Sequence, residues 1–300
     1  GIPGAQLTGE QWLLVRKLSD HIQQVFKWFD AERQMAYSNL YEVVKSSYYE
    51  KAIIECIDLI IDDRGSVKDK ASEDLSKIRT QLFKKRQELR RIFEKVVQRL
   101  AKSGYTADID ESFSNGRRVV AVFSEYKRQV KGFLHGESDS RKTAFIEPEE
   151  TIELNNELYG LEQDELKEVQ KILRALTAQL APYSSLLLSY AQIIGSFDFI
   201  RAKALLAIDM NANRPMVHNK AITHLIEAYH PLLYIYNKAS GKKTIPVNLE
   251  LDDEARILII SGPNAGGKTV SMKTLGLNQV MLQSGLLVPM SATSQMGIYK

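Results

Sequence analysis

The sequence contains one cysteine and no long apolar run, and each scarcity removes a class of protein. A single thiol, Cys56, cannot form an internal disulfide, which fits a reducing compartment. Its apolar neighbours favour a small core side chain over a reactive one. A membrane-spanning helix needs about 18 or more consecutive apolar residues, and no segment of the sequence has such a run. Nothing at the N-terminus resembles a signal peptide. We therefore expect a cytoplasmic protein with no membrane partner.

Metal-binding and nucleophilic motifs are also missing from the sequence. None of the five histidines has a second histidine, cysteine or carboxylate at a plausible metal spacing, so we interpret His218, His224 and His230 as structural or turn residues. No nucleophile–base pair is visible. The formal net charge of +3 is too small to indicate nucleic-acid binding by itself. The distribution of charge must carry that information.

One glycine-rich motif does carry chemistry. Residues 262–269 have the pattern G-x-x-x-x-G-K-T of a phosphate-binding P-loop. The apolar residues 257–260 before it predict a buried strand, and residues 271–275 after it predict a helix. Glycines let backbone amides turn toward a polyphosphate, and the start of the helix adds its positive dipole end. The predicted nucleotide-binding residues are Gly262, Pro263, Asn264, Ala265, Gly266, Gly267, Lys268, Thr269 and Val270.

The last two motif residues predict ATP and Mg²⁺ as cofactors. Lys268 would neutralise the β- and γ-phosphate oxygens, and the Thr269 hydroxyl would hold Mg²⁺. Hydrolysis also needs an acidic Mg²⁺ ligand on a neighbouring strand and a residue that positions water, but no apolar strand ending in Asp or Glu follows residue 269. We interpret the chain as a fragment with no complete catalytic set. We expect it to bind nucleotide weakly without hydrolysis.

Two segments of opposite charge predict a pair of long helices. Each carries a narrow apolar stripe, and Lys85 and Arg99 occupy seam positions of the first. Residues 77–99 hold nine basic and two acidic side chains, whereas residues 147–171 hold nine acidic and two basic. This complementarity favours mutual pairing. The predicted antiparallel coiled-coil lever consists of residues 77–105 and 149–181.

Between the lever arms the pattern changes from helical to strand-like. A hairpin-turn signal at residues 114–117 precedes a β-branched run at 118–123, and residues 129–135 and 143–146 predict further strands. Residues 106–148 are thus predicted to form a small β clamp tip, with basic side chains beside aromatic ones. Its candidates for contact with the DNA backbone are Arg117, Arg118, Lys127, Arg128, Lys131, Arg141 and Lys142.

The remaining segments complete a mainly α fold. Helical periodicity predicts core segments at residues 1–76 and 182–215, with one helix through Tyr41 and Ile57 and a turn at residues 62–65. Residues 216–300 are predicted to be the N-terminal part of an α/β P-loop ATPase domain.

Several motifs in this order carry a family resemblance. Besides the P-loop, they are Lys-Thr-Leu-Gly-Leu at 273–277, Val-Lys-Gly-Phe-Leu-His at 130–135, Ala-Phe-Ile-Glu-Pro at 144–148, Glu-Leu-Asn-Asn-Glu-Leu at 153–158, Asp-Phe-Ile-Arg-Ala-Lys-Ala at 198–204 and His-Pro-Leu-Leu at 230–233. From about residue 60 onward, the chain resembles the MutS superfamily of DNA-repair ATPases. The most similar branch is the second bacterial MutS paralogue, the anti-recombination type that often carries an Smr nuclease domain.

This resemblance implies a function for the full-length protein. Helical core and lever segments would connect a DNA-embracing clamp to an ABC-type ATPase that works as a homodimer. Thr244 and Ile245 would lie near the adenine, which adds Ile245 to the nucleotide-binding residues. The mismatch-reading N-terminal domain of the family and its Phe-x-Glu wedge are absent. We therefore expect ATP-dependent binding to branched recombination or repair intermediates rather than to mismatches.

Two other functions remain open at this stage. A ribosome-rescue ATPase acting on collided ribosomes would use the same motor and contact RNA through the basic tip. A structural coiled-coil protein of the SMC type would carry a vestigial P-loop, although its arms would run to hundreds of residues.

Overall fold

The computed structural model describes residues 6–106, 112–114, 116–263 and 266–299. Helices dominate, accompanied by two four-stranded sheets, which confirms the mainly α fold with small β parts. The chain divides into two compact units, Gly1–Ala191 and Gln192–Lys300. In the described part of the chain, no helix combines the length and the apolar composition that crossing a bilayer requires.

The first unit begins with four helices, α1 (Gly9–Trp28), α2 (Ala31–Ala36), α3 (Ser38–Tyr41) and α4 (Lys51–Ile60). The predicted single helix through Tyr41 and Ile57 is wrong, because the chain leaves helical geometry between α3 and α4. Glu50 caps α4 by accepting a hydrogen bond from the Ala52 amide at 3.0 Å, and its own amide donates to the Tyr190 hydroxyl at 2.8 Å. The predicted turn is present, with Asp62 accepting from the amides of Arg64 and Ser66.

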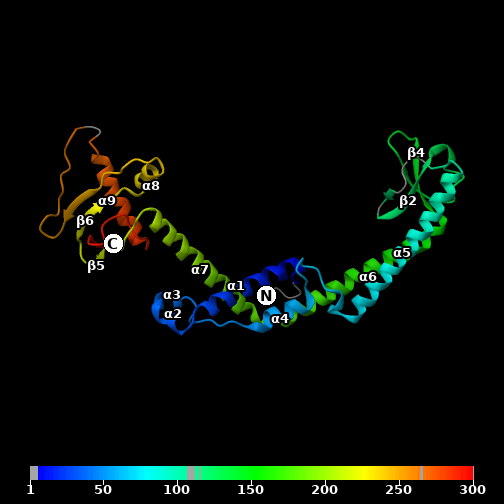
Figure 1. The fold of residues 1–300 in the computed structure, drawn as a ribbon, viewed down its shortest axis with the longest axis horizontal. Coiled ribbons are helices and arrows are strands. Elements are labelled where there is room, and N and C mark those ends of the chain that lie inside the picture. Colours follow the sequence, from blue (N-terminus) through cyan, green and yellow to red (C-terminus); the bar gives the residue numbers. More distant parts are fainter. Residues whose placement is uncertain (1–5, 107–111, 115, 264–265, 300) are drawn as a thin grey trace. The chain divides into compact units, whose positions relative to one another are not determined.

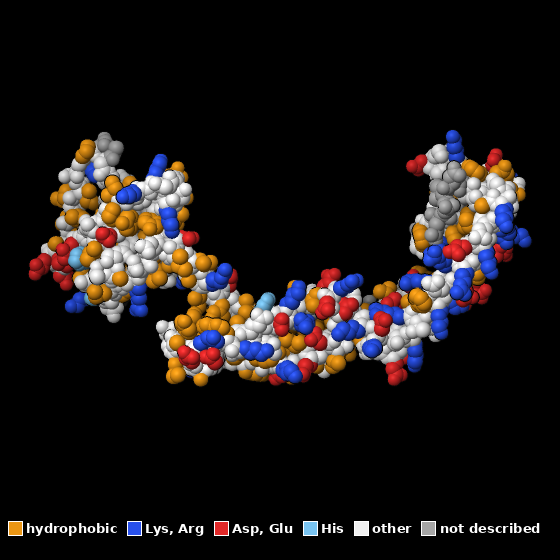
Figure 2. Space-filling view, viewed as in Figure 1, with side chains coloured by type: hydrophobic (Ala, Val, Ile, Leu, Met, Phe, Trp, Pro, Cys, Tyr) orange, Lys and Arg blue, Asp and Glu red, His pale blue; other side chains and the backbone are white. Residues whose placement is uncertain are grey.

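A short 3-10 turn, η1 (Asp69–Ala71), leads into the long helix α5 (Glu73–Lys102). A second long helix, α6 (Glu149–Leu180), runs antiparallel to α5 (Figure 1). Buried leucines from both helices form their common core. Figure 2 shows basic and acidic side chains interspersed along the pair. Cross-helix ion pairs join the early part of α5 to the later part of α6 and the end of α5 to the start of α6. Their distances are 2.7, 2.6, 2.8 and 2.5 Å for Arg79–Glu165, Lys85–Glu157, Arg86–Glu162 and Arg99–Glu150.

A small antiparallel sheet packs on the end of this helix pair. Its strands are β1 (Ser112–Ser114), β2 (Arg117–Phe123), β3 (Gly132–Glu137) and β4 (Thr143–Pro148), in the order β1-β2-β4-β3, with the 3-10 turn η2 (Ser124–Tyr126) after β2. Phe93, Val96 and Leu100 of α5 pack against buried residues of β2 and β4. The register Ser114↔Arg117 fits the predicted two-residue turn, of which Asn115 lies outside the described residues.

The third strand, predicted at residues 129–135, lies further along the chain, at residues 132–137. Residues 129–131 are not part of β3, because the Gln129 amide donates to the Tyr126 carbonyl in a turn. The strand begins at Gly132, where a Cβ would lie 2.0 Å from the Glu147 carbonyl oxygen. Only glycine permits so close an approach of the two backbones, and its φ of +154° is in a region that side chains rarely adopt.

The second unit contains a second small sheet and its helices. After the 3-10 turn η3 (Ala181–Tyr183), α7 (Ser184–Asp209) runs through the boundary between the units. Helices α8 (Pro231–Ala239) and α9 (Lys268–Gln283) accompany β5 (Met216–His218), β6 (Thr223–Ala228), β7 (Val247–Leu251) and β8 (Gln295–Gly297). The sheet has the order β5-β8-β6-β7, and only β5 and β8 are parallel. Asn278 ties α9 to the end of β6 by donating to the Tyr229 carbonyl at 3.1 Å.

Candidate nucleotide and nucleic-acid sites

The glycine-rich segment turns directly into α9. Gly262 and Gly267 have φ values of +149° and +85°, which are strained for residues with a side chain. The Gly266 amide donates to the Pro263 carbonyl at 3.1 Å, and the helix begins at Lys268. Asn264 and Ala265 lie outside the described residues. The first amides of a helix have no carbonyl partners within it, so this end of α9 has the donors that an anion needs.

Lys268 folds back over this turn. Its ammonium group donates a hydrogen bond to the Gly262 carbonyl at 2.6 Å. This bond links the first residue of the glycine-rich segment to the start of α9. Thr269 and Val270, next in the first turn of α9, are exposed. An oxygen of a bound anion can replace the Gly262 carbonyl as the acceptor for Lys268. The chemistry of this donor set therefore fits a phosphate group.

The predicted strand before the P-loop is not formed. Residues 257–260 have no regular secondary structure, and the side chains of Ile257 and Ile259 are each 85% exposed. After β7, Asp252 accepts from the amides of Glu254 and Ala255, which turns the chain and holds the pKa of Asp252 below its usual value. A strand requires a neighbour for its backbone groups, and no described strand lies beside this segment. The prediction of a buried strand is therefore wrong for this structure.

The two residues expected near the adenine lie after α8. The Thr244 hydroxyl accepts from Asn237 at 3.0 Å and donates to the Leu233 carbonyl at 3.4 Å, so α8 holds this part of the chain. Ile245 follows with an exposed side chain. Their role toward a base stays a prediction.

The seven candidate cations of the β tip separate into two groups. In the first, Arg117 forms an ion pair with Glu147 at 2.9 Å, Arg118 lies over the Phe93 and Phe113 rings at 5.9 and 5.6 Å, and Lys127 pairs with Glu137 at 2.5 Å. The hydrogen bond from Lys127 holds the pKa of Glu137 below its usual value. These three side chains already contribute to the tip structure. The second group consists of four exposed residues, Arg128, Lys131, Arg141 and Lys142.

Ser124 brings the exposed cations into one region. Its amide donates to the Lys142 carbonyl at 3.0 Å, and its hydroxyl donates to the Arg141 carbonyl at 2.7 Å. The loop before β4 is therefore fixed to the start of η2, and the turn after η2 carries the other two cations. We name Arg128, Lys131, Arg141 and Lys142 the tip cations.

Comparison with known proteins identifies the family. A protein named Endonuclease MutS2 from Carboxydothermus hydrogenoformans is 33% identical to the chain over 295 residues, covering 98% of this chain and 37% of that protein. The same name belongs to relatives from Enterococcus faecalis, 33% identical over 99% of the chain, and from Listeria monocytogenes, 36% identical over 83%. The chain belongs to the MutS2 branch of the MutS superfamily. No protein-family model matches it. The chain spans about a third of the length of these MutS2 relatives.

Sequence reasoning missed a polar network inside the tip of this MutS2-branch chain. Glu147, at the end of β4, is only 1% exposed. It accepts hydrogen bonds from Arg117 at 2.9 and 3.2 Å, from Asn155 of α6 at 2.8 Å and from His135 Nε2 at 2.7 Å. Burial opposes ionisation, yet the bonds from His135, Asn155 and Arg117 outweigh it and hold the pKa of Glu147 below its usual value. The carboxylate thus joins three strands to α6.

Proposed function

We propose that this chain forms the lever, clamp tip and phosphate-binding loop of an ATP-dependent DNA-binding protein of the MutS type. Its substrates would be branched recombination or repair intermediates, and the full-length protein would work as a homodimeric ATPase. Membership of the MutS2 branch supports this proposal, and the names of the relatives give no support to a ribosome-rescue ATPase or an SMC-like protein.

The observation that carries the DNA-binding part is the exposure of the four tip cations together, at the end of the helix pair. Exposed lysine and arginine side chains release counterions when they contact phosphates, so they supply affinity that is independent of sequence. The other three cations of the tip already contact protein groups. We therefore assign the contact with the DNA backbone to Arg128, Lys131, Arg141 and Lys142.

The nucleotide part of the proposal rests on residues 262–270. The helix N-terminus and Lys268 would hold the β- and γ-phosphates, and the Thr269 hydroxyl would contact Mg²⁺. Thr244 and Ile245 would contact the base. Bound Mg²⁺–ATP supplies the phosphoryl group whose transfer to water the full-length protein would catalyse. The part of this chain is to bind and orient that nucleotide.

Fluorescence anisotropy with a labelled four-way junction and a duplex of equal length tests the DNA-binding part. Changing all four tip cations to alanine should weaken binding and flatten the plot of log affinity against log salt by about 0.9 for each lost contact, or about 3.6 in all. A matched control changes four exposed cations of the helical core, Lys17, Lys27, Arg64 and Lys70, and should leave the slope unchanged. Equal slopes in both variants would mean that the tip does not bind the backbone.

A further inference from the structure

Two adjoining pockets lie along the helix pair, apart from the tip cations. The first has a volume of about 510 Å³ and includes Arg79, Phe83 and Arg86 in its lining. The second, of about 270 Å³, is bounded by Arg86, Phe113, Arg118 and Tyr159. Arg86 lines both pockets, so they are neighbours on the helix pair. We call the two pockets together the arm groove.

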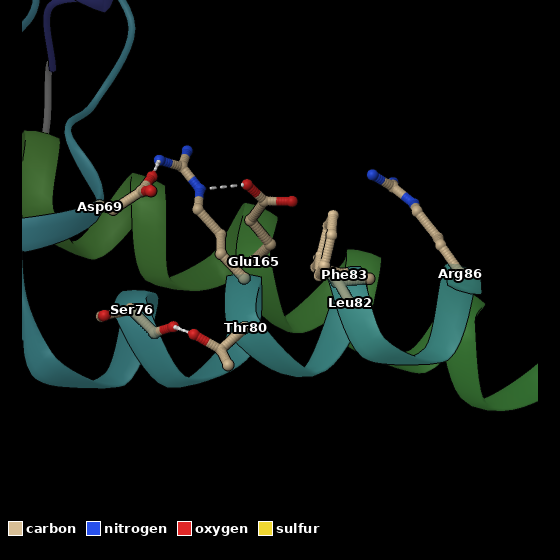
Figure 3. A pocket seen from close by; sticks show the side chains of 8 residues that line it. Asp69, Ser76, Thr80, Leu82, Phe83, Arg86 and Glu165 are labelled. Atoms are coloured by element: carbon tan, nitrogen blue, oxygen red, sulfur yellow. Dashed lines mark hydrogen bonds and ion pairs between the residues drawn. The ribbon is translucent and has the colours of Figure 1, made fainter. Parts of the chain in front are cut away.

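Exposed aromatic rings follow the arm groove. Phe83 of α5, Phe113 of β1 and Tyr159 of α6 are 66%, 64% and 61% exposed. Figure 3 shows Phe83 and Arg86 projecting from neighbouring turns on the same side of α5. The lining of the first pocket combines the buried Leu82 with polar and charged side chains, among them Arg79 and Glu165. Three large rings that expose most of their surface beside one groove present flat faces on which another π system can stack.

Guanidinium groups line the same pockets as these rings. Arg118 lies over the Phe113 ring at 5.6 Å, which places positive charge beside that ring. Arg86 pairs with Glu162 at 2.8 Å, and both side chains are about half exposed. An exposed pair of this kind contributes little to stability, so a phosphate can replace Glu162 as the partner of Arg86. Arg79 has a different role, because Asp69, Glu165 and the Val67 carbonyl hold it in the groove wall.

We infer that the arm groove binds unpaired nucleotides of a single DNA strand. Phe83, Phe113 and Tyr159 stack on bases, while Arg86 contacts the phosphates between them. Aromatic rings alternating with cations are how proteins hold single strands without regard to sequence. In a duplex the base faces are stacked on one another, so they cannot stack on the aromatic rings. A neutral peptide has no negative charge to pair with the arginine side chains. The inference rests on the proposed DNA-binding function and adds that the arm groove takes the unpaired nucleotides of a branched substrate.

The test compares three labelled ligands by anisotropy at one salt concentration: oligo-dT, a blunt duplex and a fork with a single-stranded flap. The variant changes Phe83, Phe113 and Tyr159 to alanine. Because stacking on one ring strengthens binding about tenfold, the variant should lose at least 100-fold in oligo-dT affinity and a large part of its preference for the fork. Its affinity for the blunt duplex should stay within about twofold, since the tip cations are intact.

The matched control removes three exposed apolar side chains of the helical core, Met35, Tyr48 and Leu59, and should bind all ligands normally. Circular dichroism checks that each variant folds. An unchanged oligo-dT affinity in the ring variant, or a wild-type chain that binds the duplex but no oligo-dT, overturns the inference and leaves the proposed function standing. A wild-type chain that binds none of the DNA ligands overturns the proposed function as well. Oligo-U is measured as a fourth ligand, and tighter binding to it than to oligo-dT overturns the assignment to DNA.

Discussion

Replacing Glu147 with glutamine should open the β tip while leaving the helical core intact. The change keeps the size of the side chain but removes the charge that Arg117 and His135 contact. Breaking a buried ion pair costs about 3–5 kcal/mol because the remaining charge has no partner. The Arg117 side chain is 30% exposed, so water compensates in part. We expect a loss of about 3 kcal/mol, at the lower end of that range.

Hydrogen exchange measures this loss where it occurs. At about 1.4 kcal/mol per factor of ten, amides of β2 and β4 should exchange about 100-fold faster in the variant. Amides of α1 should be unaffected. The control is Glu137→Gln at the same tip, where Lys127 is the partner and the pair is exposed to solvent. Equal acceleration in both variants, or none in Glu147→Gln, would refute the reasoning that burial of Glu147 fixes the tip.

Two further predictions concern the same sheet. The pKa of Glu147 is lower in the folded protein than in the unfolded chain, where it is near 4.5. The ionised carboxylate therefore contributes its full stabilisation of the tip above about pH 4.5. This contribution is lost as the pH falls through the pKa that Glu147 has in the folded protein. The protection factors of β4 amides should therefore fall below about pH 4.5 in the wild type but change little in Glu147→Gln. Gly132→Ala places a Cβ 2.0 Å from the Glu147 carbonyl oxygen and should cost about 1–3 kcal/mol by forcing β3 from β4. Normal exchange protection of β3 in that variant would contradict the close approach.

The features that sequence analysis predicted well are those encoded locally. Opposite charges on two helical segments predicted the partners that ion pairs such as Lys85–Glu157 now show. A β-branched run and an Asn-Gly turn signal likewise predicted β2 and its hairpin. In both cases, each predicted element is indicated by residues near one another in sequence, and the pairing of the two helices follows from the opposite charges of their segments.

The features that it missed depend on distant residues. The break before α4 is fixed by Tyr190, which lies 140 positions from Glu50. The Glu147 network takes its partners from β2, β3 and α6, so no short pattern reveals it. The error at residues 257–260 has a related cause. An apolar run indicates a strand only where a neighbouring strand can pair with it, and the described chain offers none there.

Calorimetric titration of the chain with ATP and Mg²⁺ measures directly whether residues 262–270 bind a triphosphate. The matched variants are Lys268→Ala and Lys273→Ala, the latter removing an exposed lysine further along α9. We expect measurable binding to the wild type and to Lys273→Ala, and at least about tenfold weaker binding to Lys268→Ala with unchanged helical content. Equal ATP affinity in all three proteins would contradict this expectation.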